Sequence, residues 1–244
     1  MKCLILAAGY ATRLYPLTEN FPKPLLTVGG KSIIDYLIDD LRTGDAVDEF
    51  VIISNHKFIN CFEDWARTKD YKPVLIDDGS TSNDNRLGAV KDIQFAVEKL
   101  GIDEDVLILA GDNVLDFSLT KFTDYCMDKK TSCVMRYFEP KKETLTKRGV
   151  LELEGDRVIG MEEKPAEPKS QFCCPPFYFY TREDIKRLPT AIAEGCGVDA
   201  PGSFVAWLCN KSTVYAMDMP GKRYDIGNLE SYEKVNKEYK GISK

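Results

Sequence analysis

The sequence predicts an α/β protein, a Rossmann-like three-layer sandwich with a mostly parallel central sheet and an antiparallel extension. Over the first 110 residues, apolar runs of strand length alternate with segments of helix length, which is typical of right-handed βαβ units. Beyond Leu119 the expected strands are joined by short connections, as antiparallel strands are. A chain of 244 residues with 43% hydrophobic residues is long enough to bury a large core.

The first half of the chain supplies the parallel strands. Lys2 to Ala8 is a continuous apolar run, which indicates a strand buried on both faces. A helix is expected over 32–41, where apolar residues recur at helical spacing and Ser32 with Asp35 form a candidate capping box. The same patterns predict strands at 49–54, 73–76 and 106–110 and helices at 60–67 and 89–100.

The second half is expected to be built onto this sheet. Its patterns predict strands at 132–138, 149–153, 157–161, 177–180 and 213–217, and helices at 182–188, 203–209 and 229–239. The aromatic strand 177–180 should place at least half of its side chains in the core. Because no repeat or linker divides the chain, we expect a single domain over 1–240, with halves at about 1–118 and 119–240 and a tail at 241–244.

Composition excludes several classes of function. The net charge of −6 argues against a nucleic acid as the main partner, since such binding depends on clustered Lys and Arg. The apolar segment after Met1 is too short for a membrane span or a signal-peptide core, so we expect a cytoplasmic protein without a membrane partner. The eight cysteines lack zinc-site spacing and should be reduced and mostly buried, and the single His56 excludes a multi-histidine metal site.

A loop of small residues follows the first strand, from Ala8 to Leu14. Such residues let backbone N–H groups approach a triphosphate, and Arg13 adds a forked donor that matches phosphate geometry. Further on, Lys23 stands between two prolines, which restrict its backbone. The alternative is a tight turn with surface cations; neither the dinucleotide pattern GxGxxG nor a P-loop is present.

Two aspartates are candidates for a metal site. Asp112 follows the strand expected at 106–110, and Asp225 precedes the last helix. Two carboxylates that converge would suit Mg²⁺, which takes one or two of them together with phosphate oxygens. Each aspartate taken alone is equally well explained as a turn or helix-capping residue.

The segment LAAGYATRLYPLTENFPKPLLTVGGKSII, from Leu6 to Ile34, closely resembles the opening of the sugar-1-phosphate nucleotidyltransferases, among them the glucose-1-phosphate thymidylyltransferases. The resemblance extends in order to about residue 239. It implies the nucleotide-diphospho-sugar transferase type of fold, an NTP and a sugar-1-phosphate as substrates, pyrophosphate as a product and Mg²⁺ as cofactor. Many members carry Gly where this chain has Ala11.

Weaker motifs of the same family occur later in the chain. Glu162-Glu163-Lys164-Pro165 resembles the EKP element whose lysine binds the sugar phosphate. Arg148-Gly149-Val150 resembles the YGVV segment, with Arg in place of the usual Tyr. The resemblance implies a nucleotide-binding set of Leu6, Ala8, Gly9, Tyr10, Ala11, Thr12, Arg13 and Gly88, catalytic roles for Arg13 and Lys23, a sugar-phosphate set of Arg148, Gly149, Glu162 and Lys164, and metal ligands Asp112 and Asp225.

The sequence leaves the finer assignments open. We favour dTTP or UTP as the nucleotide, while the sugar is not specified and the resemblance allows a homo-oligomer. One alternative is a cytidylyltransferase for a non-sugar phosphate such as phosphocholine, although no clear cage for its ammonium group is apparent. Another is a catalytically silent nucleotide-sugar sensor, although Lys23, Asp112, Lys164 and Asp225 are all present.

Overall fold

A computed structural model describes residues 1–242, and the contacts within it divide the chain into two compact units. The first unit comprises Met1–Arg86, Ala110–Lys121 and the chain from Pro220 onward, and the second comprises Leu87–Leu109 and Phe122–Met219. The segments interleave along the chain instead of dividing near residue 118. The single domain over 1–240 stays a prediction, and residues 243–244 of the expected tail lie outside the described residues.

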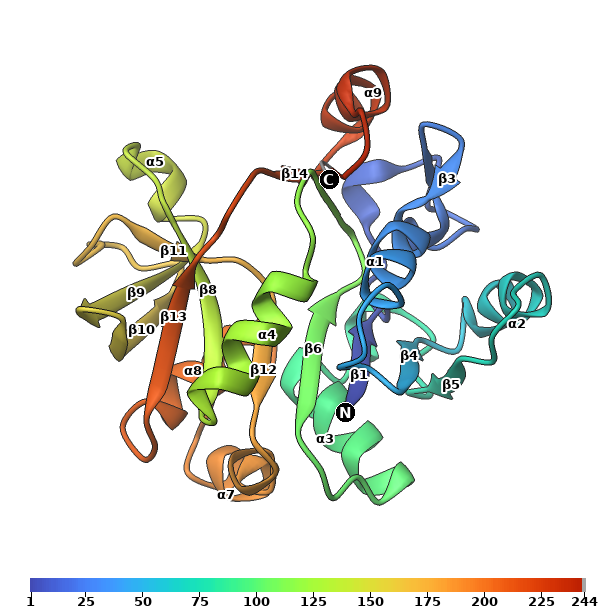
Figure 1. Ribbon diagram of the computed structural model, residues 1–244. Helices are drawn as coiled ribbons and strands as arrows, with labels where there is room; N and C mark the ends of the chain where they lie inside the picture. The colour runs from blue at the N-terminus through green and yellow to red at the C-terminus, as the bar shows by residue number, and fades with distance from the viewer. Residues whose placement is uncertain (243–244) are drawn as a thin grey trace. The chain divides into compact units, whose positions relative to one another are not determined.

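Three parallel strands form the centre of the first unit. Strand β1 (Lys2–Leu6) pairs with β4 (Glu49–Ser54), which pairs with β5 (Val74–Asp77). Helices α1 (Ile33–Leu41) and α2 (Ile59–Arg67) connect these strands, and α1 runs beside β1 and β4 (Figure 1). The predicted strand-helix alternation is therefore confirmed in this unit, with ends that differ by one or two residues.

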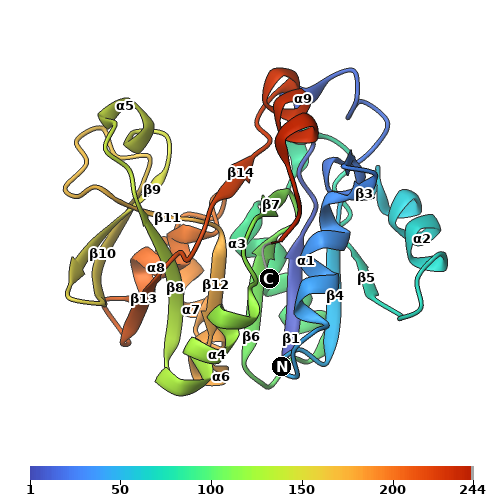
Figure 2. The ribbon, with the colours of Figure 1, turned by 45° about the horizontal axis from the view of Figure 1, so that its top comes forward.

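Short elements missed by the sequence analysis complete this unit. They are η1 (Thr12–Leu14), η2 (Lys23–Leu25), η3 (Asn83–Asn85), the ribbon of β2 (Thr27–Val28) and β3 (Lys31–Ser32), and the ribbon of β7 (Asn113–Leu115) and β14 (Arg223–Asp225). Figure 2 shows β14 beside β7, with α9 (Leu229–Glu238) after it. Val235 and Tyr239 pack with Leu14, Ile33 and Val114 in a cluster that joins these segments.

The second unit has a larger sheet in which most neighbours are antiparallel, as expected. Its strand order is β11-β9-β10-β13-β8-β12-β6. The exception is β13, which runs parallel to β8. The strands are β6 (Val106–Ala110), β8 (Ser132–Phe138), β9 (Gly149–Glu154), β10 (Arg157–Glu163), β11 (Phe172–Cys174), β12 (Phe177–Tyr180) and β13 (Val214–Asp218).

The helices of the second unit include three that were not predicted. Predicted and present are α3 (Ala89–Leu100), α6 (Arg182–Ile185) and α8 (Gly202–Leu208); the additional ones are α4 (Thr120–Lys129), α5 (Lys142–Leu145) and α7 (Leu188–Ala193). The helix expected at 182–188 ends early, and Pro189 lies in the first turn of α7, where proline is tolerated.

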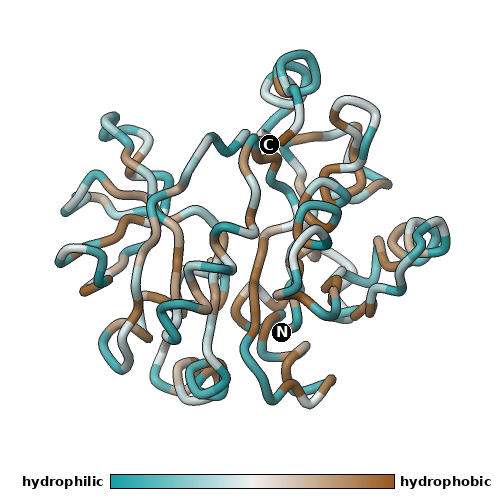
Figure 3. The backbone as a smooth tube through the Cα atoms, in the orientation of Figure 1, coloured by the Kyte–Doolittle hydropathy of each residue, from teal (hydrophilic) through white to brown (hydrophobic). Residues whose placement is uncertain are grey.

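Burial follows the apolar runs of the sequence. Figure 3 shows β6 in hydrophobic colours, and all four aromatic side chains of β12 are buried, more than the predicted half. The eight cysteines are free and six are buried, which confirms that expectation. Among the described helices, none has the length and apolar character to cross a membrane.

The capping box predicted at α1 is not formed. Ser32 is the N-cap residue, but its side chain makes no cap hydrogen bond and donates to Asp35 Oδ2 instead. The Asp35 carboxylate also accepts Trp65 Nε1 at 3.0 Å and Lys69 Nζ at 2.8 Å. Asp35 is thus used to join α1 to the end of α2 and not to cap its own helix.

Asp184 offers a test of the packing in the second unit. This buried carboxylate accepts hydrogen bonds from Ser132 Oγ at 2.6 Å and from Ser212 Oγ at 3.1 Å. Asp184→Ala leaves these donors without their partner, so it should lower the free energy of unfolding by about 1–3 kcal/mol in urea denaturation. Glu183→Ala is the control. Glu183 is the exposed neighbour of Asp184, and its substitution should change the free energy of unfolding by less than about 0.5 kcal/mol. Equal effects of the two substitutions would contradict this account.

Candidate active site

The loop after β1 is anchored to the carboxyl ends of the parallel strands. Ala7 N–H donates to the Ile53 carbonyl at 2.8 Å. Asn55, which follows β4 and is fully buried, donates from Nδ2 to the Ala8 carbonyl at 2.9 Å and accepts Phe58 N–H at 3.0 Å. Gly9 between these anchors is exposed, and a Cβ added there would contact nothing within 4 Å. Hydrogen bonds therefore fix the loop on the side of the strands, whereas its backbone is exposed to solvent at Gly9.

Ala11 adopts a left-handed backbone conformation, with φ 46° and ψ 41°. An L-residue with a Cβ is disfavoured there, which explains why glycine suits this position. The conformation is held because the Ala11 carbonyl accepts both Leu14 N–H at 2.9 Å and Thr18 Oγ1 at 2.8 Å. Thr18 is fully buried. Thr18 therefore shapes the loop that precedes it.

The remaining side chains of the loop face different surroundings. Tyr10 is buried, with its hydroxyl 3.4 Å from Ser80 Oγ and its ring 6.1 Å from that of Phe58. Burial raises the pKa of Tyr10, so its hydroxyl stays neutral at physiological pH. Thr12 and Arg13 are exposed. Tyr10 thus supports the loop by packing, whereas Arg13 is accessible to a ligand.

Lys23 forms an ion pair with Asp112. Lys23 Nζ lies 2.6 Å from Asp112 Oδ2, and the lysine side chain is only 9% exposed while that of aspartate is 42% exposed. Asn113 Nδ2 donates to the other carboxylate oxygen, Oδ1, at 2.9 Å and contacts the Ala110 carbonyl at 3.1 Å. Two residues predicted for one site, far apart in the sequence, are therefore in direct contact.

Gly111 brings Asp112 close to the first loop. Its N–H donates to the Leu6 carbonyl at 2.9 Å. A Cβ on Gly111 would lie 3.0 Å from Ile5 Cγ2, 3.2 Å from the Leu6 carbonyl oxygen and 3.4 Å from Pro24 Cγ. The absence of a side chain at this position lets the end of β1, the segment Pro22-Lys23-Pro24 and Asp112 approach one another.

The β7/β14 ribbon places the backbone of Asp225 beside Asn113. Asp225 pairs with Asn113, the residue after Asp112, in antiparallel register. Residues paired in this way have Cα atoms about 4.5–5.5 Å apart. Arg223 Nη1 donates to Asn113 Oδ1 at 2.8 Å. Arg223, Asn55 and Thr18 are supporting residues that the predicted site set did not include.

In the second unit, the geometry gives Gly88 a packing role. Its φ is 91°, and a Cβ there would lie 2.6 Å from the Val198 carbonyl oxygen. The adjacent N–H groups of Ala89 and Val90 donate to the carbonyls of Asp199 and Val198 at 3.3 and 3.0 Å. The segment 198–199 thus explains why glycine is present, and the predicted role of Gly88 in binding the base stays a prediction.

The predicted sugar-phosphate residues gather at the end of β10. Gly149 pairs with Glu163, and a Cβ on Gly149 would lie 3.2 Å from Glu163 Oε1. Lys164 has a positive φ of 50°, held by its N–H donating to the Arg148 carbonyl at 2.9 Å. Arg148, Gly149 and Lys164 therefore lie together, with the Lys164 side chain exposed.

The sequence analysis selected Glu162 for the acceptor, which stays a prediction, whereas the carboxylate that lies beside Gly149 is that of Glu163. Glu162 is exposed, whereas Glu163 is partly buried and accepts the N–H of Gly202 at the start of α8. Burial raises the pKa of Glu163, and the neighbouring Lys164 opposes this rise. The inward-facing carboxylate beside Gly149 is thus Glu163.

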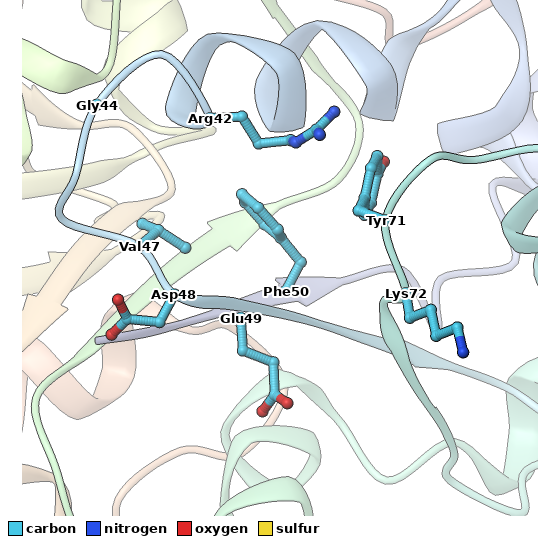
Figure 4. Close-up of a pocket in the computed structure, with 8 residues that line it drawn as sticks. All are labelled: Arg42, Gly44, Val47, Asp48, Glu49, Phe50, Tyr71 and Lys72. Atoms are coloured by element: carbon cyan, nitrogen blue, oxygen red, sulfur yellow. The ribbon is translucent and has the colours of Figure 1, made fainter.

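A separate pocket of about 350 Å³ lies at the opposite end of the first unit's strands, where β4 begins (Figure 4). Arg42, Phe50 and Tyr71 are grouped around it. Three of its charged groups are already paired: Arg42 with Asp70 at 3.0 Å, Asp48 with the amino terminus at 2.6 Å and Glu49 with Lys2 at 2.8 Å. Ligands of open α/β sheets bind at the carboxyl ends of the strands, so the candidate site is not this pocket.

Comparisons with known proteins show which proteins this chain is similar to. A family model described as nucleotidyl transferase matches residues 2–241. A "Putative mannose-1-phosphate guanyltransferase" of Sulfolobus acidocaldarius is 26% identical over 98% of this chain, which spans only 63% of that relative. A "Putative UTP--glucose-1-phosphate uridylyltransferase" of Bacillus subtilis is 24% identical over 96% of this chain and 94% of its own length.

Solved structures show the same fold. A glucose-1-phosphate thymidylyltransferase structure from Bacillus anthracis, named as putative, matches with a TM-score of 0.80 at 20% identity, covering 100% of this chain and 98% of that one. An apo UDP-glucose pyrophosphorylase structure matches with a TM-score of 0.81 at 21% identity, covering 98% of this chain and 97% of that one. The mixed α/β nucleotidyltransferase fold predicted from the sequence is thereby confirmed.

The strain at Ala11 is testable by substitution. Ala11→Gly removes the cost of the left-handed backbone conformation, about 1–2 kcal/mol. It also raises the entropy of the unfolded chain, which destabilises the fold by about 0.4–1 kcal/mol. We therefore expect the free energy of unfolding to rise by about 0.5–1 kcal/mol. Urea denaturation measures it. Ala8→Gly is the matched control and should lose stability, because Ala8 has no positive φ. A loss in both variants would contradict the strain at Ala11.

Proposed function

Because this chain belongs to the nucleotidyl transferase family, we propose that it joins an NTP to a sugar-1-phosphate, forming an NDP-sugar and pyrophosphate. The observation that carries this proposal is the contact of Lys23 with Asp112, close to the end of β1 where the anchored loop begins. Phosphate-binding and metal-binding candidates from distant parts of the sequence meet there. The names of both relatives, which refer to sugar-1-phosphate substrates, support the choice of acceptor.

In this proposal the NTP phosphates lie over the loop from Ala8 to Arg13. The exposed backbone at Gly9 leaves room for a close approach, and the exposed Arg13 supplies a forked donor to phosphate oxygens. Lys23 supplies a second cation from a backbone fixed by Pro22 and Pro24. Their combined charge would stabilise the transition state and the departing pyrophosphate.

The residues at the site fit the Mg²⁺ that the family resemblance implies. Asp112 and Asp225 offer hard carboxylate oxygens, and the pairing of Asp225 with Asn113, the residue after Asp112, supports their use as a pair. Within residues 1–242 no group of three or more His, Cys, Asp or Glu side chains gathers as a metal site, so phosphate oxygens would complete the coordination. The bound ion would neutralise phosphate charge.

The chemistry requires positioning more than proton transfer. An oxygen of the sugar phosphate, already ionised at neutral pH, would attack the α-phosphorus in line, and the bond to pyrophosphate would break. No general base is needed, which agrees with the lack of a histidine at the site: His56 pairs with Asp77 at 2.6 Å on the surface. Arg13 and Lys23 then act by holding charge in place.

For the acceptor, we propose that Lys164 and Arg148 bind the phosphate and that Gly149 lets the backbone meet the sugar. Glu163, instead of Glu162, would accept a sugar hydroxyl, since its carboxylate faces Gly149 and Gly202. For the base we favour uracil or thymine beside Gly88. The two relatives are named for guanylyl and uridylyl transfer, so GTP belongs in any test.

The reaction type is tested by pyrophosphate release. With Mg²⁺ and each NTP in turn, a panel of sugar-1-phosphates should give pyrophosphate in a coupled colorimetric assay. Asp112→Ala and Asp225→Ala should each lower the rate by at least about 100-fold, the usual scale for losing transition-state charge stabilisation. Asp45→Ala, which removes an exposed carboxylate outside the β7/β14 ribbon, is the control and should keep the rate within about threefold. The absence of pyrophosphate with every NTP and sugar phosphate would leave the sensor alternative.

Substitutions of two neighbouring glutamates test the acceptor site. Glu163→Gln should lower kcat/KM for the sugar-1-phosphate by about 10- to 100-fold, because a charged hydrogen bond contributes about 1.5–3 kcal/mol. The KM for the NTP should change little. Glu162→Gln, the matched control on the exposed side of β10, should keep its kcat/KM within about threefold. The reverse order would assign the acceptor role to Glu162.

A further inference from the structure

The two oxygens of the Asp112 carboxylate are held in different ways. Oδ1 accepts the Asn113 amide, and Asn113 is buried and fixed on both sides, by the Ala110 carbonyl and by Arg223. Oδ2 accepts only the ammonium of Lys23, at 2.6 Å, among the contacts resolved for the described chain. The amide belongs to a rigid network, whereas the ammonium sits at the end of a flexible stem.

Lys23 and a divalent cation therefore have the same preferred partner. Both are attracted by the negative charge of Asp112, and both would occupy the space in front of Oδ2. An ammonium at 2.6 Å from this oxygen leaves no room for an ion at a coordination distance of about 2.0–2.1 Å on the same side. One cation must move before the other takes its place.

We propose that Lys23 serves as the resident counter-charge of Asp112 and that it competes with the metal ion until a nucleotide draws its ammonium away. This inference rests on the proposed function, which assigns Asp112 to the metal and Lys23 to the phosphates. A bare ion must displace Lys23 and leave a nearly buried ammonium without a partner, which is costly. An ion that arrives with a triphosphate brings both a cation for Asp112 and an anion for Lys23.

Linkage makes the coupling reciprocal. If Lys23 weakens metal binding at Asp112, metal binding weakens the hold of Asp112 on Lys23 by the same factor. The Lys23 ammonium is thus released toward phosphate when the metal ion and nucleotide are bound. Without them, Asp112 holds the ammonium away from the phosphate position. Lys23 would act as a positioning residue for Asp112 before it acts on substrate.

The test measures binding of Mn²⁺ alone, in the absence of nucleotide, by electron paramagnetic resonance of the free ion. Lys23→Met and Lys23→Gln both remove the competing charge with different shapes, and each should bind Mn²⁺ at least about fivefold more tightly than the unchanged protein. Lys23→Arg keeps the charge and should remain weak. Asp112→Asn should lose the added affinity when combined with Lys23→Met.

Lys31→Met is the matched control, because it breaks another ion pair of 2.6 Å, with Asp39, away from the site. Its Mn²⁺ affinity should be unchanged. Circular dichroism melting confirms which variants are folded. Equal or weaker Mn²⁺ binding by a folded Lys23→Met or Lys23→Gln protein overturns the competition. A failure of the proposed function is seen separately, as a lack of pyrophosphate release by the unchanged protein.

Discussion

The close approach of Gly111 to the end of β1 is the constraint on which the arrangement of the first unit depends. Gly111 N–H donates to Leu6 O, and a Cβ on Gly111 would lie only 3.0–3.4 Å from its three nearest neighbours, tighter than an ordinary van der Waals contact. This contact sets Asp112 within reach of Lys23 and starts β7 at Asn113, which in turn receives β14. The backbone contact of Gly111 and the buried amide of Asn113 thus position three segments, at Lys23, Asp112 and Arg223, that lie more than 80 residues apart in the sequence.

Two of the three non-glycine residues with positive φ in the described chain lie where ligand contacts are proposed, and the third, Lys130, follows α4. Ala11 and Lys164 both have positive φ without being glycine, and each is held by hydrogen bonds from its surroundings. Such conformations persist only where neighbouring structure determines them. The loop at Ala11 is held by the buried Thr18 hydroxyl, and the turn at Lys164 by its own N–H donating to Arg148. Both candidate binding segments are therefore shaped before a ligand arrives.

The fold was largely predictable because its long elements carry strong patterns. The apolar run of β1 and the helical spacing of α3 are each sufficient to identify an element. The β7/β14 ribbon was not predictable, because its three-residue strands have no period and their pairing joins residues more than 100 positions apart. For the same reason the sequence predicted Asp112 and Asp225 as a pair only through the family resemblance, while the register supplies their physical connection.

The identity of the inward-facing glutamate depends on an irregularity that no simple pattern contains. In a regular strand, side chains alternate, so the burial of Val158 would turn Glu162 to the same inner face. The pairing of β10 with β9 shifts between Val158 and Gly160, and this bulge reverses the alternation beyond it. Met161 is consequently buried, Glu162 is exposed, and Glu163 faces Gly149. One extra residue in a strand therefore decides which of two adjacent carboxylates faces Gly149.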